Sequence, residues 1–178
     1  MRQRVVAFTG ISGVGKTTFL RRLAEQVSFQ HVTGGSLIAA ARQAMPDKRD
    51  ALRHADLDEN QRLLIDGFAV ARDPAADLVV MDGHVVIDDG RTLNELPTSV
   101  FRALGVTLIV HLEADPAWIA GNRSRDASRS RPTHAPEALS QHQAKSHAHA
   151  TAIAEELNID ICVVAHADVA KLAAMLSS

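Results

Sequence analysis

Residues 10–17 of this chain, GISGVGKT, match the pattern G-x-x-x-x-G-K-[ST] at every fixed position. The motif follows a strand-like apolar run at 4–9 and opens a helix-like pattern, which is the context in which it is specific. Glycines let the backbone wrap closely around phosphate oxygens, and the N-terminus of a helix adds positive potential. We therefore predict that these residues form a P-loop (Walker A motif) that binds the phosphates of a nucleoside triphosphate.

Two further features concern the metal ion that accompanies such a nucleotide. The lysine of the motif can bridge the β- and γ-phosphates, and the hydroxyl of the next residue can bind Mg²⁺. An acidic residue after a buried strand usually completes the magnesium site, and Asp82 follows the apolar run at 78–81. We predict ATP and Mg²⁺ as ligands, Thr17 and Asp82 as metal-binding residues, and a donor site formed by Gly10, Gly13, Val14, Gly15, Lys16, Thr17 and Thr18.

Short apolar runs alternate with helical patterns along the chain. The runs are β-branched or aliphatic with little polar alternation, as in strands that are buried on both faces. This alternation indicates βαβ units, a mainly parallel sheet and a three-layer α/β fold. An Asp-Gly pair within 85–92 predicts a hairpin. The predicted strands are Arg4–Thr9, Gln30–Thr33, Leu78–Met81, Val106–Leu112 and Ile159–Val164, and the predicted helices lie at 16–27, 36–44, 60–72, 116–125, 136–157 and 169–176.

Composition excludes several classes of protein. With 178 residues, 46% of them hydrophobic, the chain is long enough for one core, and we predict a single domain over 1–178. A net charge of −2 and an aromatic content of 3% argue against nucleic acid as a partner. No apolar run approaches the roughly 20 residues of a membrane span. The single cysteine, Cys162, fits a reducing compartment, so we expect a cytoplasmic protein without a membrane partner.

Missing motifs narrow the class of nucleotide-binding protein. The chain has neither the Asn-Lys-x-Asp sequence of GTPases nor the Leu-Ser-Gly-Gly signature of transporter ATPases, and it is short for a remodelling ATPase. Small-molecule kinases remain. Such enzymes need charge neutralisation and exclusion of water around the transferred phosphate, which a closing lid that carries arginines can supply. A polar segment suited to this role contains Arg123, Arg125, Arg129 and Arg131.

In the order of its motifs, most of the chain resembles the adenylate kinases, and above all their short-chain archaeal type. The features that carry the resemblance are Thr9–Thr18, Thr33-Gly34, Asp82-Gly83-His84, Leu96-Pro97, Arg129-Ser130-Arg131 and His142-Gln143. The resemblance implies the nucleoside-monophosphate kinase fold, with five parallel strands in the order 2-3-1-4-5. It also implies Mg·ATP as phosphoryl donor and a nucleoside monophosphate, AMP or dAMP, as the small-molecule acceptor.

The resemblance also implies roles for single residues. Arg123 would flank the base of ATP at the start of a lid that spans about 123–136. Arg129 and Arg131 would reach the transferred phosphate and would act in catalysis together with Lys16 and Asp82. An acceptor-binding insertion would span about 34–75, and the acceptor pocket would be lined by Thr33, Gly34 and His84.

One departure from the family leaves the acceptor open. Common adenylate kinases carry an arginine for the acceptor phosphate five residues beyond the threonine of the Thr-Gly pair, and this chain has Ile38 there. Three arginines further along could take its place, namely Arg42, Arg53 and Arg62. One alternative is therefore a kinase of a small hydroxylated metabolite, of the gluconate or shikimate type, with Asp82 or His84 as its base. Another is an adenylate-kinase-like ATPase that acts as an assembly or regulatory factor.

Two interpretations concern the histidines of one helix-like segment and the single tryptophan. His142, His147 and His149 lie on a helix-like segment without the cysteine or carboxylate partners of a zinc site, which favours a solvated helix face. Trp118 precedes the lid, and we expect it to serve in packing rather than in stacking. The sequence leaves the oligomeric state and the pathway open.

Overall fold

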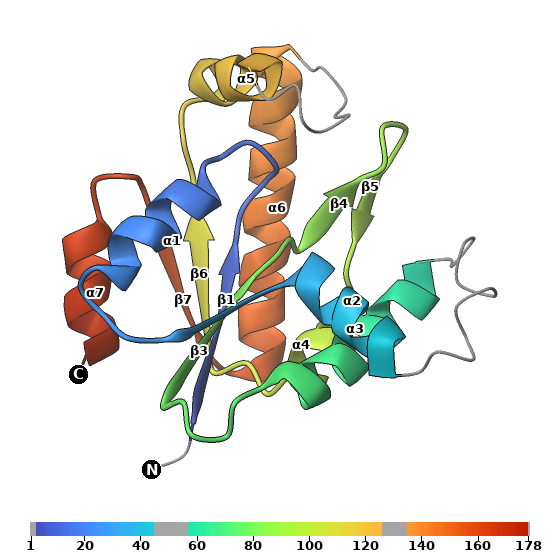
Figure 1. Ribbon diagram of the computed structural model, residues 1–178. Helices are drawn as coiled ribbons and strands as arrows, with labels where there is room; N and C mark the ends of the chain where they lie inside the picture. Colours follow the sequence, from blue (N-terminus) through green and yellow to red (C-terminus); the bar gives the residue numbers. More distant parts are fainter. Residues whose placement is uncertain (1–2, 45–56, 126–134, 178) are drawn as a thin grey trace.

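A five-stranded parallel sheet forms the centre of the computed structural model, which describes residues 3–44, 57–125 and 135–177 (Figure 1). Its strand order is β2-β3-β1-β6-β7, and every pairing in it is parallel. With the hairpin strands β4 and β5 set aside, this is the predicted order 2-3-1-4-5. The strands are β1 Arg4–Thr9, β2 Gln30–Thr33, β3 Leu78–Asp82, β6 Leu108–Leu112 and β7 Asp160–Val164.

Apolar side chains on both faces explain why the central strands show no polar alternation. Along β1, Val5 and Ala7 belong to one core cluster, whereas Val6 and Phe8 belong to the cluster on the other face. All four side chains are 0–1% exposed. Because a strand directs successive side chains to opposite faces, β1 has to be apolar throughout to separate two helical layers.

The helices form the two outer layers (Figure 1). Residues of α1 and α7 fill the core on one face, and residues of α2, α3, α4 and most of α6 fill the core on the other. The α5 helix packs against the start of α6. The helices are α1 Lys16–Ala24, α2 Gly34–Ala44, α3 Leu57–Ala71, α4 Thr98–Ala103, α5 Pro116–Arg125, α6 Pro136–Leu157 and α7 Val169–Ser177.

Some boundaries differ from the sequence-based expectations. The first helix ends at Ala24 instead of Val27, and β6 begins at Leu108 instead of Val106. The α4 helix was not predicted, because six residues are too few to show helical periodicity. Within the described parts of the chain, no helix combines the length and the apolar character that crossing a membrane requires.

The predicted hairpin is confirmed and consists of β4 Val86–Asp88 and β5 Leu93–Glu95. In its turn the carboxylate of Asp89 accepts hydrogen bonds from the backbone N–H groups of Arg91 and Thr92. These bonds favour the ionised form and hold the pKa of Asp89 below its usual value. The hairpin projects from the sheet on the side of α2 and α3 (Figure 1).

The α2 and α3 helices cross in contact at Gly67 of α3. A Cβ atom added at Gly67 would overlap the main-chain carbonyl of Leu37 in α2. The Leu37 side chain is fully buried, so the two backbones cannot separate without opening the core. Only glycine permits this crossing.

We predict that Gly67→Ala lowers the free energy of unfolding by about 2 kcal/mol or more, because the added methyl group overpacks the crossing. The matched control is Gly121→Ala, in which the new Cβ would make an ordinary contact 3.6 Å from the Arg125 side chain. That control should be neutral or should stabilise the helix by up to about 1 kcal/mol. Urea denaturation of both variants measures the difference, and equal midpoints would contradict the prediction.

Candidate nucleotide-binding site

A cleft of about 970 Å³ opens at the carboxyl ends of the parallel strands. In open parallel sheets this edge is where ligands bind, at the point where the strand order reverses. Here β1 lies between β3 and β6, so its P-loop stands at that point. The cleft residues include Lys16, Thr17, Thr18, His31, Thr33, Gly34, Asp82, His84, Trp118, Asn122 and Arg125.

The backbone of the P-loop has a conformation that only glycine adopts easily. Gly13 and Gly15 have φ angles of 87° and 90°, in the left-handed region. A Cβ at Gly13 would stand 2.8 Å from Cγ of Arg123, and one at Gly15 would stand 2.7 Å from Cε1 of His166. Both glycines are therefore required by the packing around the loop as well as by its backbone angles.

Side chains from distant parts of the sequence bond to the carbonyl groups of the P-loop. The donors come from the turn after β3, from α5 and from the loop after β7. In a trans peptide the N–H points away from the C=O, so these bonds turn the following N–H groups away from the donors. The bonds are His84 Nδ1 to Gly10 at 2.8 Å, Arg123 Nε to Ser12 at 2.8 Å, Asn122 Nδ2 to Gly13 at 3.1 Å and His166 Nε2 to Val14 at 2.8 Å.

The Lys16 side chain lies between the P-loop and Asp82. Its Nζ donates to the carbonyl of Gly10 at 2.9 Å and stands 3.9 Å from Oδ1 of Asp82. On the other side of the carboxylate, Nε2 of His31 is 3.9 Å from Oδ2. The lysine and aspartate side chains are 9% and 13% exposed, so their charges face each other where water screens them little.

The sheet register explains why Asp82 reaches this position. Asp82 is the last residue of β3 and pairs with Phe8 of β1 on one side and Thr33 of β2 on the other. Two predicted site residues, Asp82 and Thr33, are therefore neighbours in the sheet, and the P-loop begins just beyond β1. Parallel pairing brings together residues that are far apart in the sequence.

His84 is neutral at physiological pH. Burial and the positive charge of Lys16 lower its pKa from 6.5 to about 3. Since a carbonyl only accepts, Nδ1 carries the proton that is donated to Gly10. A base with so low a pKa takes up protons poorly at neutral pH, which argues against His84 as the base of a metabolite kinase.

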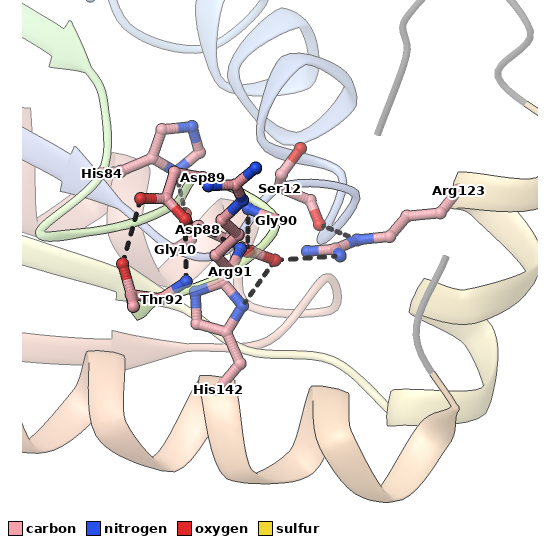
Figure 2. A network of polar contacts seen from close by, with 10 residues as sticks. All are labelled: Gly10, Ser12, His84, Asp88, Asp89, Gly90, Arg91, Thr92, Arg123 and His142. Carbon is pink, nitrogen blue, oxygen red and sulfur yellow. Dashed lines mark hydrogen bonds and ion pairs between the residues drawn. The ribbon is translucent and has the colours of Figure 1, made fainter. Parts of the chain in front are cut away.

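A second buried charge cluster lies beneath the P-loop, where α5, α6 and the hairpin meet (Figure 2). The guanidinium of Arg123 is 3.9 Å from the Asp88 carboxylate, and Nδ1 of His142 is 4.0 Å from the same oxygen. The three side chains are 3%, 9% and 4% exposed. Figure 2 shows Arg123 directed toward both Ser12 and Asp88, so one side chain connects the P-loop to the hairpin.

Comparison with known proteins gives the family. A family model described as "AAA domain" matches residues 9–140. An adenylate kinase of Pyrococcus abyssi is 30% identical over 166 residues, which cover 90% of this chain and 85% of the relative. An adenylate kinase of Methanoculleus marisnigri is 31% identical over 159 residues, which cover 80% and 79%. The chain belongs to the adenylate kinase family.

A solved structure shares the fold of this member of the adenylate kinase family. The crystal structure of shikimate kinase from Bacteroides thetaiotaomicron superposes with a TM-score of 0.58, at 13% sequence identity, over 98% of this chain and 99% of the other. At that identity the likeness concerns the fold, which is the predicted P-loop kinase fold. The prediction of a kinase is confirmed by the family.

Three residues that were considered for the acceptor site from the sequence, Thr33, Gly34 and Ile38, all line the cleft. Of the three arginines that could replace the missing one, Arg42 lines a shallower hollow that shares Ile38 with the cleft. Arg62 is not on the cleft wall, and Arg53 falls outside the described residues. Arg129 and Arg131 of the predicted lid also fall outside them. The roles of these residues stay predictions.

Two side-chain interpretations from the sequence are wrong. His142 does not lie on a solvated face. The amino-terminal half of α6 passes beneath the hairpin, and the His142 side chain is buried there beside Asp88. On the same helix, His147 is 43% exposed and bonds Glu113, while His149 is 15% exposed and donates to the carbonyl of Leu96. Trp118 was expected to serve in packing rather than in stacking, yet its side chain is 42% exposed, so a large part of the indole faces the cleft instead of packing against the protein.

Several polar residues around the P-loop and beneath it are marked by no sequence motif. Asn122 and His166 support the P-loop through main-chain carbonyls, so no motif marks them. His111 lies deeper, in β6, and is fully buried with Nδ1 2.8 Å from Oγ1 of Thr9. Burial, followed by the charges of His147 and Lys16, lowers its pKa from 6.5 to about 4.

We predict a pH-dependent loss of stability that depends on His111. Its contribution is complete above pH 6.5 and is lost as the pH falls toward 4, because the unfolded chain then binds a proton that the folded chain excludes. Between pH 7 and pH 5 the wild type should lose about 1–2 kcal/mol more than His111→Asn. Urea denaturation at both pH values tests this, and parallel losses would refute it.

Proposed function

We propose that this protein transfers the γ-phosphoryl group of Mg·ATP to a nucleoside monophosphate. The observation that carries the proposal is a single cleft with two halves that meet at Lys16 and Asp82. One half is formed by the P-loop, and the other by the start of α2 and by α3. A donor and an acceptor bound in these halves would meet with their phosphates together, which is the positioning that phosphoryl transfer requires.

The P-loop side suits a triphosphate and its metal ion. Lys16 would hold the donor phosphates together with the N–H groups of residues 13–18. The hydroxyl of Thr17 and the carboxylate of Asp82 are hard oxygen donors on the same cleft, and they would hold Mg²⁺. When bound, the ion would neutralise part of the phosphate charge. Mg²⁺ prefers one or two protein oxygens together with phosphates and water, so these two residues suffice.

A nucleoside monophosphate needs no base in this chemistry, because its phosphate oxygen is already an anionic nucleophile at neutral pH. The main obstacle is repulsion between two phosphate groups. Lys16 would reduce it from below, and we assign Arg129 and Arg131 to reduce it from the lid. Closure of such a lid would also exclude water, which would otherwise hydrolyse ATP.

The acceptor half combines polar and apolar walls, as a site for a nucleoside does. Its half-buried polar side chains include Thr33, Asn60 and Gln61, and its buried apolar side chains include Leu64 and Phe101. AMP or dAMP is the acceptor that the names of the relatives favour. Because Arg42 lines the hollow beside Ile38, we propose it as the partner of the acceptor phosphate.

A kinase of a small hydroxylated metabolite is the second candidate, because Ile38 stands where common adenylate kinases have an arginine. Such an acceptor must lose a proton to a base, and of the two residues considered for that role, Asp82 and His84, the low pKa of His84 disfavours the histidine. An ATPase that acts as an assembly or regulatory factor is the third, and it would turn over ATP without any acceptor.

The deciding experiment measures ADP formation with Mg·ATP and each ribo- and deoxynucleoside monophosphate, beside a control without acceptor. The proposal predicts rapid turnover with one or two monophosphates and very little without them. Equal rates with and without acceptor would indicate the ATPase. Turnover only with shikimate, gluconate or a similar alcohol would indicate the metabolite kinase.

We predict that Lys16→Ala removes nearly all transfer, because the donor phosphates lose the lysine of the P-loop, whose ammonium group would neutralise part of their charge. The matched control is Lys171→Ala, which removes an exposed lysine from α7. Circular dichroism should show the same fold for both variants. Full activity in Lys16→Ala would overturn the assignment of the P-loop.

We predict that Arg131→Ala lowers kcat by about a thousandfold, as expected for an arginine that contacts the transferred phosphoryl group. Arg102→Ala provides the comparison, because Arg102 is 58% exposed on α4 and pairs with Glu156. Steady-state kinetics at saturating ATP and acceptor separates the two. An unchanged kcat in Arg131→Ala would mean that the lid lies elsewhere.

A further inference from the structure

The only tryptophan of the chain, Trp118, lies on the cleft instead of in the core. It belongs to the first turn of α5, and its side chain is 42% exposed. An indole exposed in a concave site loses the burial that usually stabilises this residue. Its exposed surface is available to a ligand in the cleft that it lines.

A fixed imidazole supports the indole. The ring of His166 lies 4.8 Å from the ring of Trp118, with an angle of 58° between their planes. His166 is itself held, because its Nε2 donates to the carbonyl of Val14 and its own carbonyl accepts from Arg22. The indole therefore rests on a neighbour that cannot turn without breaking a bond to the P-loop.

The two rings stand at the P-loop itself. A Cβ added at Gly15 would meet Cη2 of Trp118 at 2.9 Å and Cε1 of His166 at 2.7 Å. Asp82 and Thr33, in contrast, belong to the side of the cleft that leads to α2 and α3. With the acceptor on that side, the nucleoside of the donor has to leave the P-loop toward α5 and the loop after β7.

We propose that Trp118, backed by His166, is the platform on which the base of the donor nucleotide stacks. This inference rests on the proposed function and deepens it. It gives Trp118 the position beside the base that the family resemblance implies for Arg123, whose side chain is 3% exposed and directed toward Asp88. Stacking on an indole suits any base, so the platform favours a nucleotide over a bare polyphosphate without choosing the base.

The single tryptophan permits a direct test. Its fluorescence is titrated with Mg·ATP and, separately, with Mg·tripolyphosphate, which carries the phosphates without a base. Calorimetry under the same conditions shows whether each ligand binds. The platform predicts saturable quenching by ATP and unchanged fluorescence when tripolyphosphate binds. Equal changes with both ligands would indicate a response to phosphate alone and would overturn the proposal, as would bound ATP without any change.

Substitutions test the same point by affinity. Trp118→Leu should weaken ATP binding by about 5- to 150-fold, the range that the loss of one base–aromatic stack produces, and should leave tripolyphosphate binding unchanged. Trp118→Phe should retain most of the ATP affinity because it keeps an aromatic face. The control Val70→Ala removes an exposed apolar side chain that is 61% exposed on α3 and should change neither. Equal ATP affinity in wild type and Trp118→Leu would refute the platform.

The outcome for the platform is separable from that for the proposed function. ATP-specific quenching together with ATP hydrolysis that needs no acceptor would support the platform and refute the monophosphate kinase. Rapid phosphorylation of a monophosphate, together with equal ATP affinity in wild type and Trp118→Leu, would support the monophosphate kinase and refute the platform. Failure to bind ATP at all would refute both.

Discussion

Four main-chain carbonyls of the P-loop accept hydrogen bonds from side chains that lie from 6 to 152 residues away in the sequence. A glycine-rich loop on its own would sample many conformations, because glycine has the least restricted backbone. These bonds select one of them and keep its N–H groups directed away from the donors. The turn after β3, the α5 helix and the loop after β7 therefore all support the same P-loop, residues 10–17.

The parallel sheet makes this arrangement possible. Each of these segments follows a strand of the sheet, directly or after a short loop, and parallel strands end at one edge. The shikimate kinase structure shares the fold at 13% identity, so the architecture tolerates nearly complete change of sequence. In the function that we propose for this chain, the donor side would be built on backbone geometry, whereas the acceptor side would depend on individual side chains such as Ile38 and Arg42.

The sequence was informative where chemistry requires a local pattern. The P-loop motif, the aspartate after a buried strand and all five sheet strands were predictable, because each depends on neighbouring residues. His142 and Trp118 were misjudged because their surroundings come from elements far away in the chain. The helix that carries His142 is rich in alanine, and its buried stripe includes Ser146 and Ala150, so polarity does not mark its inner face. His166 and Asn122 act on carbonyl groups, which no sequence pattern encodes.

The crossing at Gly67 also has a mechanical consequence. Sliding of α3 along α2 would drive the backbone of Leu37 against that of the opposing helix, since no side chain separates them there. We therefore expect α2 and α3 to move together rather than past each other wherever this part of the protein moves. In the proposed function, the cleft wall that these two helices form would keep its shape when an acceptor binds, because the contact at Gly67 opposes a change in their relative position.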